Sequence, residues 1–194
     1  MIAAVIPVKR LTEGKSRLAA RLSPAERAEL ITDLVRRAVD ALRESGMVEC
    51  IALATPEVAL AQSLKVDALP DGGSLNAALR GAVGWATEMG AAGLLILPGD
   101  LPLLGGEDVR AMAAVLPDPP AISIAPTRDG GTGALLLSPP AVIPLSFGPA
   151  SFEQHLQLAH DCGVRVSPVM RTALSFELDT VEDLDVFAKF GPRV

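Results

Sequence analysis

Short, continuous apolar runs alternate with longer stretches of helical periodicity along the chain. The apolar runs predict buried strands at residues 1–8, 48–55, 93–100, 121–127, 133–139 and 164–170. The periodic stretches predict helices at residues 23–46, 74–90, 105–116 and 150–163, with a last helix starting near residue 179. Because the strands are apolar throughout and helices separate most of them, the pattern predicts a largely parallel sheet covered on both faces.

The helix predicted at residues 23–46 has clear end signals. Ser23 is a good N-cap, Pro24 suits the first helical position, and Glu26 completes a capping box. Gly46 is a typical C-terminal stop. In parallel sheets, ligands bind beyond the carboxyl ends of the strands. The segments expected at that edge are residues 7–17, 98–102 and 126–133.

Length and composition indicate one globular domain over residues 1–194, with 49% hydrophobic and 21% charged residues. A net charge of −6 argues against a general nucleic-acid binder, whose affinity comes mainly from basic charge. No apolar run reaches the ~18 residues of a membrane span, and no signal peptide is visible. We therefore expect a cytoplasmic protein in which Cys50 and Cys162 are reduced and buried.

The triplet Gly14-Lys15-Ser16 has the letters that end a Walker phosphate loop. That loop needs a glycine five residues before Gly14, where this chain has Lys9. It also runs straight into a helix, whereas here several residues separate Ser16 from the cap at Ser23. The Walker interpretation therefore fails.

A loop carrying Lys9, Arg10, Lys15 and Arg17 remains after the first strand. Four cations within nine residues of an acidic protein need a counter-charge, and a polyphosphate is a natural one because Lys and Arg form charge-assisted hydrogen bonds to its oxygens. The alternative is a solvated basic loop paired with surface carboxylates.

Two aspartates are candidates for a magnesium site. Asp100 follows an apolar strand in a Pro-Gly turn, and Asp179 stands at a predicted helix start. Mg²⁺ prefers one or two protein carboxylates together with phosphate oxygens, so the pair could hold metal ions between two sets of phosphates. Turn chemistry for Asp100 and N-capping for Asp179 are the alternatives.

Two glycine-containing segments are candidates for anion binding. In residues 128–133, three glycines allow a ligand close to the backbone, and Thr132 adds a hydroxyl; a hairpin turn is the alternative. In residues 147–156, Gly148 precedes Ser151 at a helix start, where backbone amides favour an anion; a plain N-cap is the alternative. The two histidines lie five residues apart without further partners, which argues against a zinc site or a catalytic triad.

Six stretches together resemble the CofC/FbiD family of guanylyltransferases, which make the activated intermediate of the deazaflavin coenzyme factor 420. They are "AVIPVKRLTEGKSRL", "GGSLNAAL", "LPGDLPLL", "GGTGALLL", "FGPASFEQH" and "ELDTVEDL". The resemblance covers essentially the whole chain. It implies the single-domain, three-layer α/β nucleotidyltransferase fold, similar to nucleotide-diphospho-sugar transferases, with a mostly parallel sheet.

The resemblance also implies roles for individual residues. Lys9, Lys15 and Arg17 would be catalytic and meet the phosphates of GTP. Pro7, Lys9, Lys15, Gly73 and Asn76 would bind the nucleotide, Asp100 and Asp179 would bind Mg²⁺, and Thr132, Gly148 and Ser151 would hold a phosphorylated three-carbon acid. Many relatives read Gly-Thr-Asn where this chain has Gly133 after Thr132, so a side-chain contact from that position is absent.

The implied reaction is attack by a phosphate oxygen of the acid on the α-phosphorus of GTP, with pyrophosphate leaving and the product passing to the next enzyme of the coenzyme pathway. The acceptors used in the family are phosphoenolpyruvate, 2-phospho-L-lactate and 3-phospho-D-glycerate. The alanine- and arginine-rich composition, typical of many bacterial proteins, favours phosphoenolpyruvate. The alternatives are a molybdopterin- or sugar-phosphate nucleotidyltransferase and a non-catalytic nucleotide-binding subunit. A homodimer formed through the sheet edge or residues 147–156 is compatible with the resemblance.

Overall fold

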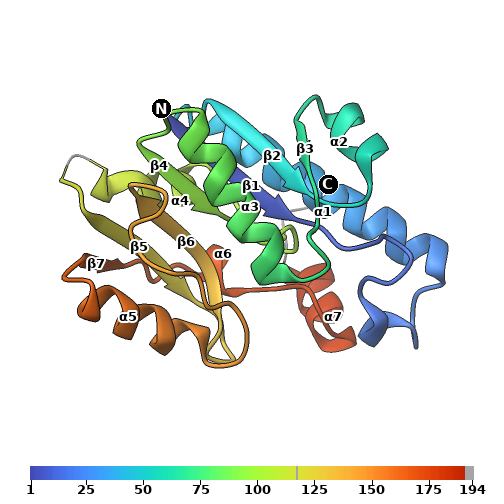
Figure 1. Ribbon diagram of the computed structural model, residues 1–194. Helices are drawn as coiled ribbons and strands as arrows, with labels where there is room; N and C mark the ends of the chain where they lie inside the picture. The colour runs from blue at the N-terminus through green and yellow to red at the C-terminus, as the bar shows by residue number, and fades with distance from the viewer. Residues whose placement is uncertain (117, 191–194) are drawn as a thin grey trace.

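The computed structural model describes residues 1–116 and 118–190, and it forms a three-layer α/β/α domain (Figure 1). One seven-stranded sheet has the order β3-β2-β1-β4-β6-β5-β7. The strands are β1 (Ile2–Pro7), β2 (Cys50–Ala54), β3 (Asp67–Leu69), β4 (Gly93–Ile96), β5 (Ala121–Pro126), β6 (Thr132–Ser138) and β7 (Arg165–Pro168). Only β6 runs antiparallel to its neighbours, so the prediction of a largely parallel sheet is confirmed.

Helices cover both faces of the sheet. The helices are α1 (Pro24–Glu44), α2 (Val58–Leu64), α3 (Leu75–Glu88), α4 (Gly106–Met112), α5 (Ser151–Asp161), α6 (Thr172–Ser175) and α7 (Val181–Phe190), with 3₁₀ turns η1 (Ser16–Leu18) and η2 (Ala113–Val115). The side chains of β1 alternate between two buried clusters. Ala4 and Ile6 pack with α1, α2 and α4, whereas Ala3 and Val5 pack with α3 and α5. A strand buried on both faces has to be apolar at every position, which explains the continuous runs in the sequence.

The ends of α1 are those predicted from its sequence. The Ser23 hydroxyl accepts a hydrogen bond from the Glu26 amide at 3.3 Å, and the Glu26 carboxylate accepts one from the Ser23 amide at 2.7 Å. Gly46 follows the helix with a φ of 66°, in the left-handed region that favours glycine. The capping box and the glycine stop are therefore confirmed.

Several short elements were not predicted. The three-residue strand β3 has exposed residues at Asp67 and Ala68, so it carries no apolar run. Helices α2 and α6 contain only seven and four residues, too few for a periodic pattern to stand out. The expectation of two buried thiols is wrong for Cys162, which is exposed, and Cys50 is only half-buried. No helix within the described residues is long and apolar enough to cross a bilayer.

A third, smaller cluster joins the two ends of the chain. Leu18 from η1, Leu34 from α1 and Leu178 are buried together, and residues of α7 pack against them. Leu18 and Leu178 are fully buried. This cluster fixes the loop after β1 beside the segment that leads into α7, and so places basic residues from one end of the chain near acidic residues from the other.

Candidate active site

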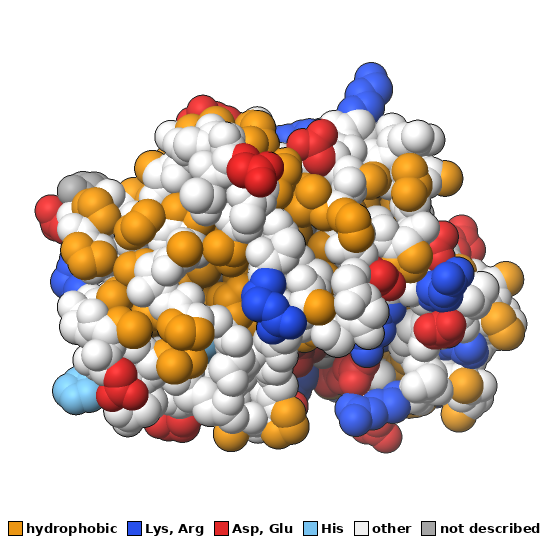
Figure 2. Space-filling model, viewed as in Figure 1, with side chains coloured by type: hydrophobic (Ala, Val, Ile, Leu, Met, Phe, Trp, Pro, Cys, Tyr) orange, Lys and Arg blue, Asp and Glu red, His pale blue; other side chains and the backbone are white. Residues whose placement is uncertain are grey.

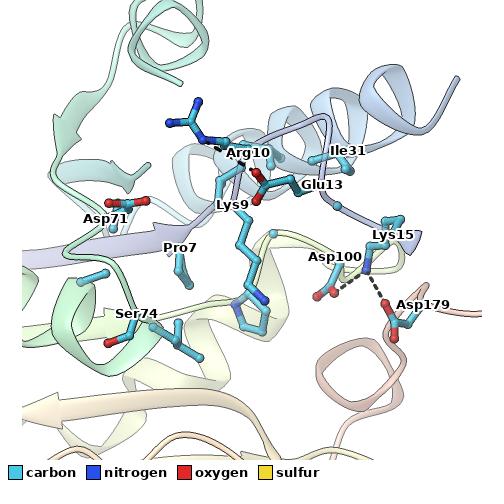
Figure 3. Close-up of a pocket in the computed structure, with 18 of the residues that line it drawn as sticks. Pro7, Lys9, Arg10, Glu13, Lys15, Ile31, Asp71, Ser74, Asp100 and Asp179 are labelled. Atoms are coloured by element: carbon cyan, nitrogen blue, oxygen red, sulfur yellow. Dashed lines mark hydrogen bonds and ion pairs between the residues drawn. The ribbon is translucent and has the colours of Figure 1, made fainter. Parts of the chain in front are cut away.

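A cavity of about 560 Å³ opens at the carboxyl edge of the parallel strands (Figure 3). It is lined by the loop after β1, the end of β2, the segment before α3, the turn after β4, the middle of α1 and Asp179. Figure 2 shows Lys, Arg, Asp and Glu side chains gathered around the hollow beside α3. The site therefore lies where the sheet topology predicts a ligand.

Lys15 lies at the centre of the charged groups. Its Nζ donates to Asp100 Oδ2 at 2.6 Å and to Asp179 Oδ1 at 3.3 Å. The Lys15 side chain is only 9% exposed, and its backbone is left-handed with a φ of 53°. A non-glycine residue in this conformation is strained, so the surrounding contacts hold it there. One buried ammonium thus joins two carboxylates that are 79 positions apart in the sequence.

Other cations of the same loop lie near this cluster. Arg17 donates to Asp179 Oδ2 at 2.9 Å, and Lys9 extends into the cavity (Figure 3). Arg10 instead pairs with Glu13 on the surface at 3.9 Å, as the solvated-loop alternative describes. The 3₁₀ turn η1 follows Lys15 and the helix begins only at Pro24, so the rejection of a Walker loop is confirmed.

The oxygen atoms of Asp100 and Asp179 suit a hard cation. Asp100 Oδ1 is buried without a hydrogen-bond partner, which leaves a desolvated carboxylate oxygen available beside the cavity. Mg²⁺ takes one or two protein carboxylates and completes its shell with phosphate oxygens and water, so this donor set fits it. No group of three or more His, Cys, Asp or Glu side chains able to hold a metal occurs within residues 1–116 and 118–190.

The N-capping alternative for Asp179 is not what the structure contains. Thr180 accepts a hydrogen bond from the Asp183 amide at 3.2 Å, while Asp183 Oδ2 accepts from the amides of Asp179 at 3.2 Å and Thr180 at 2.9 Å. Arg128 donates to the other oxygen of Asp183 at 2.7 Å. This network fixes the backbone of Asp179 and leaves its carboxylate to pair with Lys15 and Arg17.

Glu177 is a further carboxylate near the cluster that the sequence interpretation missed. Burial, and then the negative charges of Asp100, Asp129 and Asp179, raise its pKa to about 7, against a smaller opposing effect of Lys15. A signal was present: from Phe176 to Asp179 buried apolar residues alternate with half-buried acidic ones. In extended chain, alternate residues share a face, which places Glu177 on the side of Asp179.

The second predicted group, Thr132, Gly148 and Ser151, also comes together at this edge of the sheet. The hydroxyls of Thr132 and Ser151 lie 3.0 Å apart, and the Ser151 amide donates to the Gly148 carbonyl at 3.1 Å. Ala150 occupies the N-cap position of α5, so the plain N-cap alternative for Ser151 is wrong. The turn at residues 127–131 joins the antiparallel strands β5 and β6, which confirms the hairpin alternative there.

A fully buried histidine supports this second group. The Ser146 amide donates to His155 Nε2 at 3.1 Å, which requires the proton on Nδ1. Nδ1–H then donates to the Thr132 hydroxyl at 3.0 Å, which can donate in turn to Ser151. Burial lowers the pKa of His155 to about 4. The imidazole is therefore a neutral connector between β6, α5 and the loop that precedes α5.

We expect His155 to make the protein less stable at mildly acidic pH. Its pKa is about 4 in the folded chain and 6.5 when unfolded, so below pH 6.5 the unfolded state binds the extra proton. Its contribution to the free energy of unfolding falls by about 1.4 kcal/mol per pH unit as the pH drops from 6.5 toward 4. Urea unfolding of wild type and His155→Gln over this range measures the difference in slope.

The matched control is His160→Gln, on the exposed side of the same helix. The free energy of unfolding of His160→Gln should change with pH as that of wild type does. The raised pKa of Glu177 changes stability with pH in the opposite direction. Because Glu177 is present in both wild type and His155→Gln, its contribution cancels when the two are compared. Equal slopes in wild type and His155→Gln would contradict the assignment of a neutral, buried imidazole.

The residues predicted to bind the nucleotide contribute unequally to the cavity. Pro7, Gly73 and Ser74 line it. Asn76 is not among the lining residues, and its amide instead donates to the Phe147 carbonyl at 2.9 Å and accepts from the Phe147 amide at 2.9 Å. In this structure Asn76 therefore connects the start of α3 to the loop before α5.

The structure gives a steric reason for the glycine at position 133 of this chain. A Cβ at this position would lie 2.1 Å from the Leu174 carbonyl oxygen, which is a backbone atom. We expect Gly133→Ala to lower the free energy of unfolding by roughly 1–3 kcal/mol, because α6 would have to move away from β6. Urea unfolding measures this change. Gly84→Ala, in α3 with nothing within 4 Å of the added Cβ, is the control and should stabilise by about 0.5–1 kcal/mol. An equal response of both variants would refute the close approach.

Solved structures similar to this chain identify the fold class. A crystal structure from Desulfovibrio desulfuricans G20, assigned as a nucleotide-diphospho-sugar transferase, has a TM-score of 0.80 at 17% identity and covers 96% of this chain and 85% of its own. A nucleotidyl transferase from Methanothermobacter thermautotrophicus has a TM-score of 0.71 at 20% identity, covering 97% and 98%. The domain therefore has the nucleotidyltransferase fold.

Sequence relatives identify the family. The model described as "Guanylyl transferase CofC like" matches residues 2–191. The phosphoenolpyruvate guanylyltransferase of Rubrobacter xylanophilus is 43% identical over 93% of this chain and 90% of its own length. The 2-phospho-L-lactate guanylyltransferase of Methanothermobacter thermautotrophicus is 36% identical (93% and 81%), and the 3-phospho-D-glycerate guanylyltransferase of Phenylobacterium zucineum is 34% identical (99% and 91%). The chain belongs to the CofC-like guanylyl transferase family, and guanylyl transfer is its activity.

Proposed function

We propose that this guanylyltransferase joins GMP from GTP to the phosphate of phosphoenolpyruvate, releasing pyrophosphate, with Mg²⁺ as its metal and in the biosynthesis of the deazaflavin coenzyme factor 420. The observation that carries the metal and phosphate assignment is the contact of Lys15 with both Asp100 and Asp179 at the edge of the cavity. The acceptor assignment is supported by the name of the relative from Rubrobacter xylanophilus.

The basic loop is suited to bind the triphosphate. Lys9 reaches the cavity from one side, and Lys15 and Arg17 lie beside the carboxylates on the other. These cations would hold the phosphates of GTP by charge-assisted hydrogen bonds and stabilise the charge that develops as pyrophosphate leaves. Asp100 and Asp179 would hold Mg²⁺, which supplies charge neutralisation between the phosphate groups when it is bound.

Because Lys15 pairs with both carboxylates in this structure, it must exchange partners when the substrates bind. A phosphate oxygen offers Nζ a comparable charge-assisted hydrogen bond, which would leave Asp100 and Asp179 to the metal. Lys15 would therefore hold the carboxylates together before binding and contact phosphate afterwards.

The chemistry needs no strong general base. A phosphate monoester is already an anionic nucleophile near neutral pH, so it can attack the α-phosphorus of GTP directly. The bond from the α-phosphorus to the bridging oxygen breaks, and pyrophosphate leaves. Catalysis then consists of holding the two substrates in line and neutralising charge. This fits a site in which the buried histidine serves as a neutral connector.

The acceptor would bind beside the segment that carries Thr132, Gly148 and Ser151. Ser151 starts an 11-residue helix, whose N-terminal end favours an anion. This segment lies beside β6, which β4, β1 and β2 separate from β3 and from the end of the cavity that contains Gly73. A phosphorylated acid held there could approach the α-phosphorus from the side opposite the leaving group.

The deciding experiment follows pyrophosphate release with GTP and Mg²⁺ in the presence of each of the three phosphorylated acids, with mass spectrometry of the products. The expected result is the guanylylated adduct of phosphoenolpyruvate as the favoured product. Preference for 2-phospho-L-lactate or 3-phospho-D-glycerate would contradict the acceptor assignment. Turnover with only a molybdopterin or sugar phosphate, or GTP binding without turnover, would contradict the proposal as a whole.

A further inference from the structure

An unpaired acidic side chain lines the cavity far from the charged cluster. Asp71 lies in the turn between β3 and α3, at the opposite end of the cavity from Lys15 (Figure 3). One of its oxygens accepts a hydrogen bond from the Gly73 amide at 3.3 Å. No ion pair within residues 1–116 and 118–190 includes Asp71, although Arg10 lines the same cavity.

The sheet sets the distance between Asp71 and the phosphate end of the site. In the order β3-β2-β1-β4, Asp71 follows the first strand and Asp100 the last. Neighbouring strands are about 4.8 Å apart, so the carboxyl ends of β3 and β4 are separated by roughly 14 Å. An extended nucleotide covers such a distance between its base and its phosphates. With phosphates beside Lys15, the base therefore falls near Asp71.

The lining between these two ends is suited to a flat base. It includes the apolar residues Pro7, Val8, Ala54, Leu75 and Ala78, with Lys9, Gly73 and Ser74 among the other lining residues. A pocket with apolar walls and one or two polar groups gives orientation through those polar groups. Asp71 is the acidic group at this end, so it should determine which base edge fits.

A carboxylate there has a definite chemical preference. It only accepts hydrogen bonds, and its two oxygens can accept two neighbouring donors. It repels phosphate, which agrees with its place at the opposite end of the cavity from Lys15. Guanine presents two adjacent donors, N1–H and the exocyclic N2–H₂. Adenine, cytosine and uracil each place an acceptor next to the donor on the same edge, which an ionised carboxylate would repel.

We infer that the Asp71 carboxylate selects guanine in this enzyme by accepting hydrogen bonds from N1–H and N2–H₂. The inference rests on guanylyl transfer and is independent of which acid accepts the guanylyl group. It makes Asp71 a specificity-determining residue at the nucleoside end of the cavity. The Gly73 amide helps to hold the carboxylate in place by donating to one of its oxygens.

The test compares binding of GDP, IDP and XDP by calorimetry in wild type and Asp71→Asn, without any acceptor. Inosine lacks the 2-amino group, and xanthine carries an oxygen in its place. Wild type should bind IDP about 10-fold to 100-fold more weakly than GDP. Asp71→Asn should lose GDP affinity by a similar factor and gain XDP affinity, because the amide can accept from N1–H and donate to the 2-oxygen. The order of GDP and XDP should therefore reverse.

Asp67→Asn, at an exposed position of β3, is the control and should bind like wild type. An Asp71→Asn variant that weakens all three nucleotides equally would overturn the inference, since that result is expected if Asp71 contacts the ribose or only supports the turn. Unchanged GDP binding would also overturn it. Failure of the proposed function appears elsewhere, as absence of adduct in the wild-type assay, so the two failures are distinguishable.

Discussion

Asp100→Asn should reduce the rate of guanylyl transfer by about 10²-fold or more while leaving the fold intact. The substitution keeps the size of the side chain but removes the charge of the oxygen that contacts Lys15 and of the buried oxygen that has no partner. The rate should be measured as pyrophosphate release at saturating GTP over a series of Mg²⁺ concentrations. A higher Mg²⁺ requirement together with a lower maximal rate is expected, because the variant retains one of the two carboxylates.

Asp33→Asn is a suitable control, since Asp33 is a half-exposed surface residue of α1 that pairs with Arg36. Its transfer rate should be that of wild type. If Asp100→Asn retained near-normal transfer, the assignment of Asp100 to the metal would be wrong.

Lys15→Gln should lower the maximal rate of transfer but strengthen the binding of Mg²⁺. Removing the ammonium deprives the phosphates of a catalytic cation, and we expect the maximal rate to fall by about 10²-fold. The same change leaves Asp100 and Asp179 without the cation that pairs with both, so their negative charge should attract Mg²⁺ more strongly. Magnesium titrations of activity and of thermal stability would show a lower half-saturating concentration together with slower turnover.

Lys65→Gln is a closely matched control. Lys65 is exposed and has a φ of 55°, so it has the same left-handed backbone as Lys15 without the neighbouring carboxylates. A loss of activity in both variants would indicate a backbone effect. A loss in Lys15→Gln with weaker Mg²⁺ binding would contradict the partner exchange proposed for Lys15.

The sequence predicted the fold well because buried parallel strands have a strong pattern. The six longer strands and the main helices were found, since each combines an apolar run or a periodic face with clear end signals. The strand β3 was missed because it is short and partly exposed. Asp71 lies two residues after the end of β3, so the nucleoside end of the cavity was the part least visible in the sequence.

The candidate site was only partly predictable for a similar reason. Asp100 and Asp179 were identified from their positions after or before regular elements, and the structure brings both to Lys15. Glu177 was missed because its importance depends on burial and on the charges around it, which arise only in the folded chain. The contact of Asn76 with Phe147 could not be read from spacing, because the two residues are 71 positions apart.

The contact between Lys15 and Asp179 spans 164 positions of the chain. It depends on the small cluster of Leu18, Leu34 and Leu178, which needs both ends of the protein to be in place. Contacts with such a large sequence separation carry a high entropic cost and form late in folding. We therefore expect catalytic competence to be among the last properties acquired during synthesis and refolding. Recovery of guanylyl transfer would then report completion of the native structure, whereas recovery of helix content would precede it.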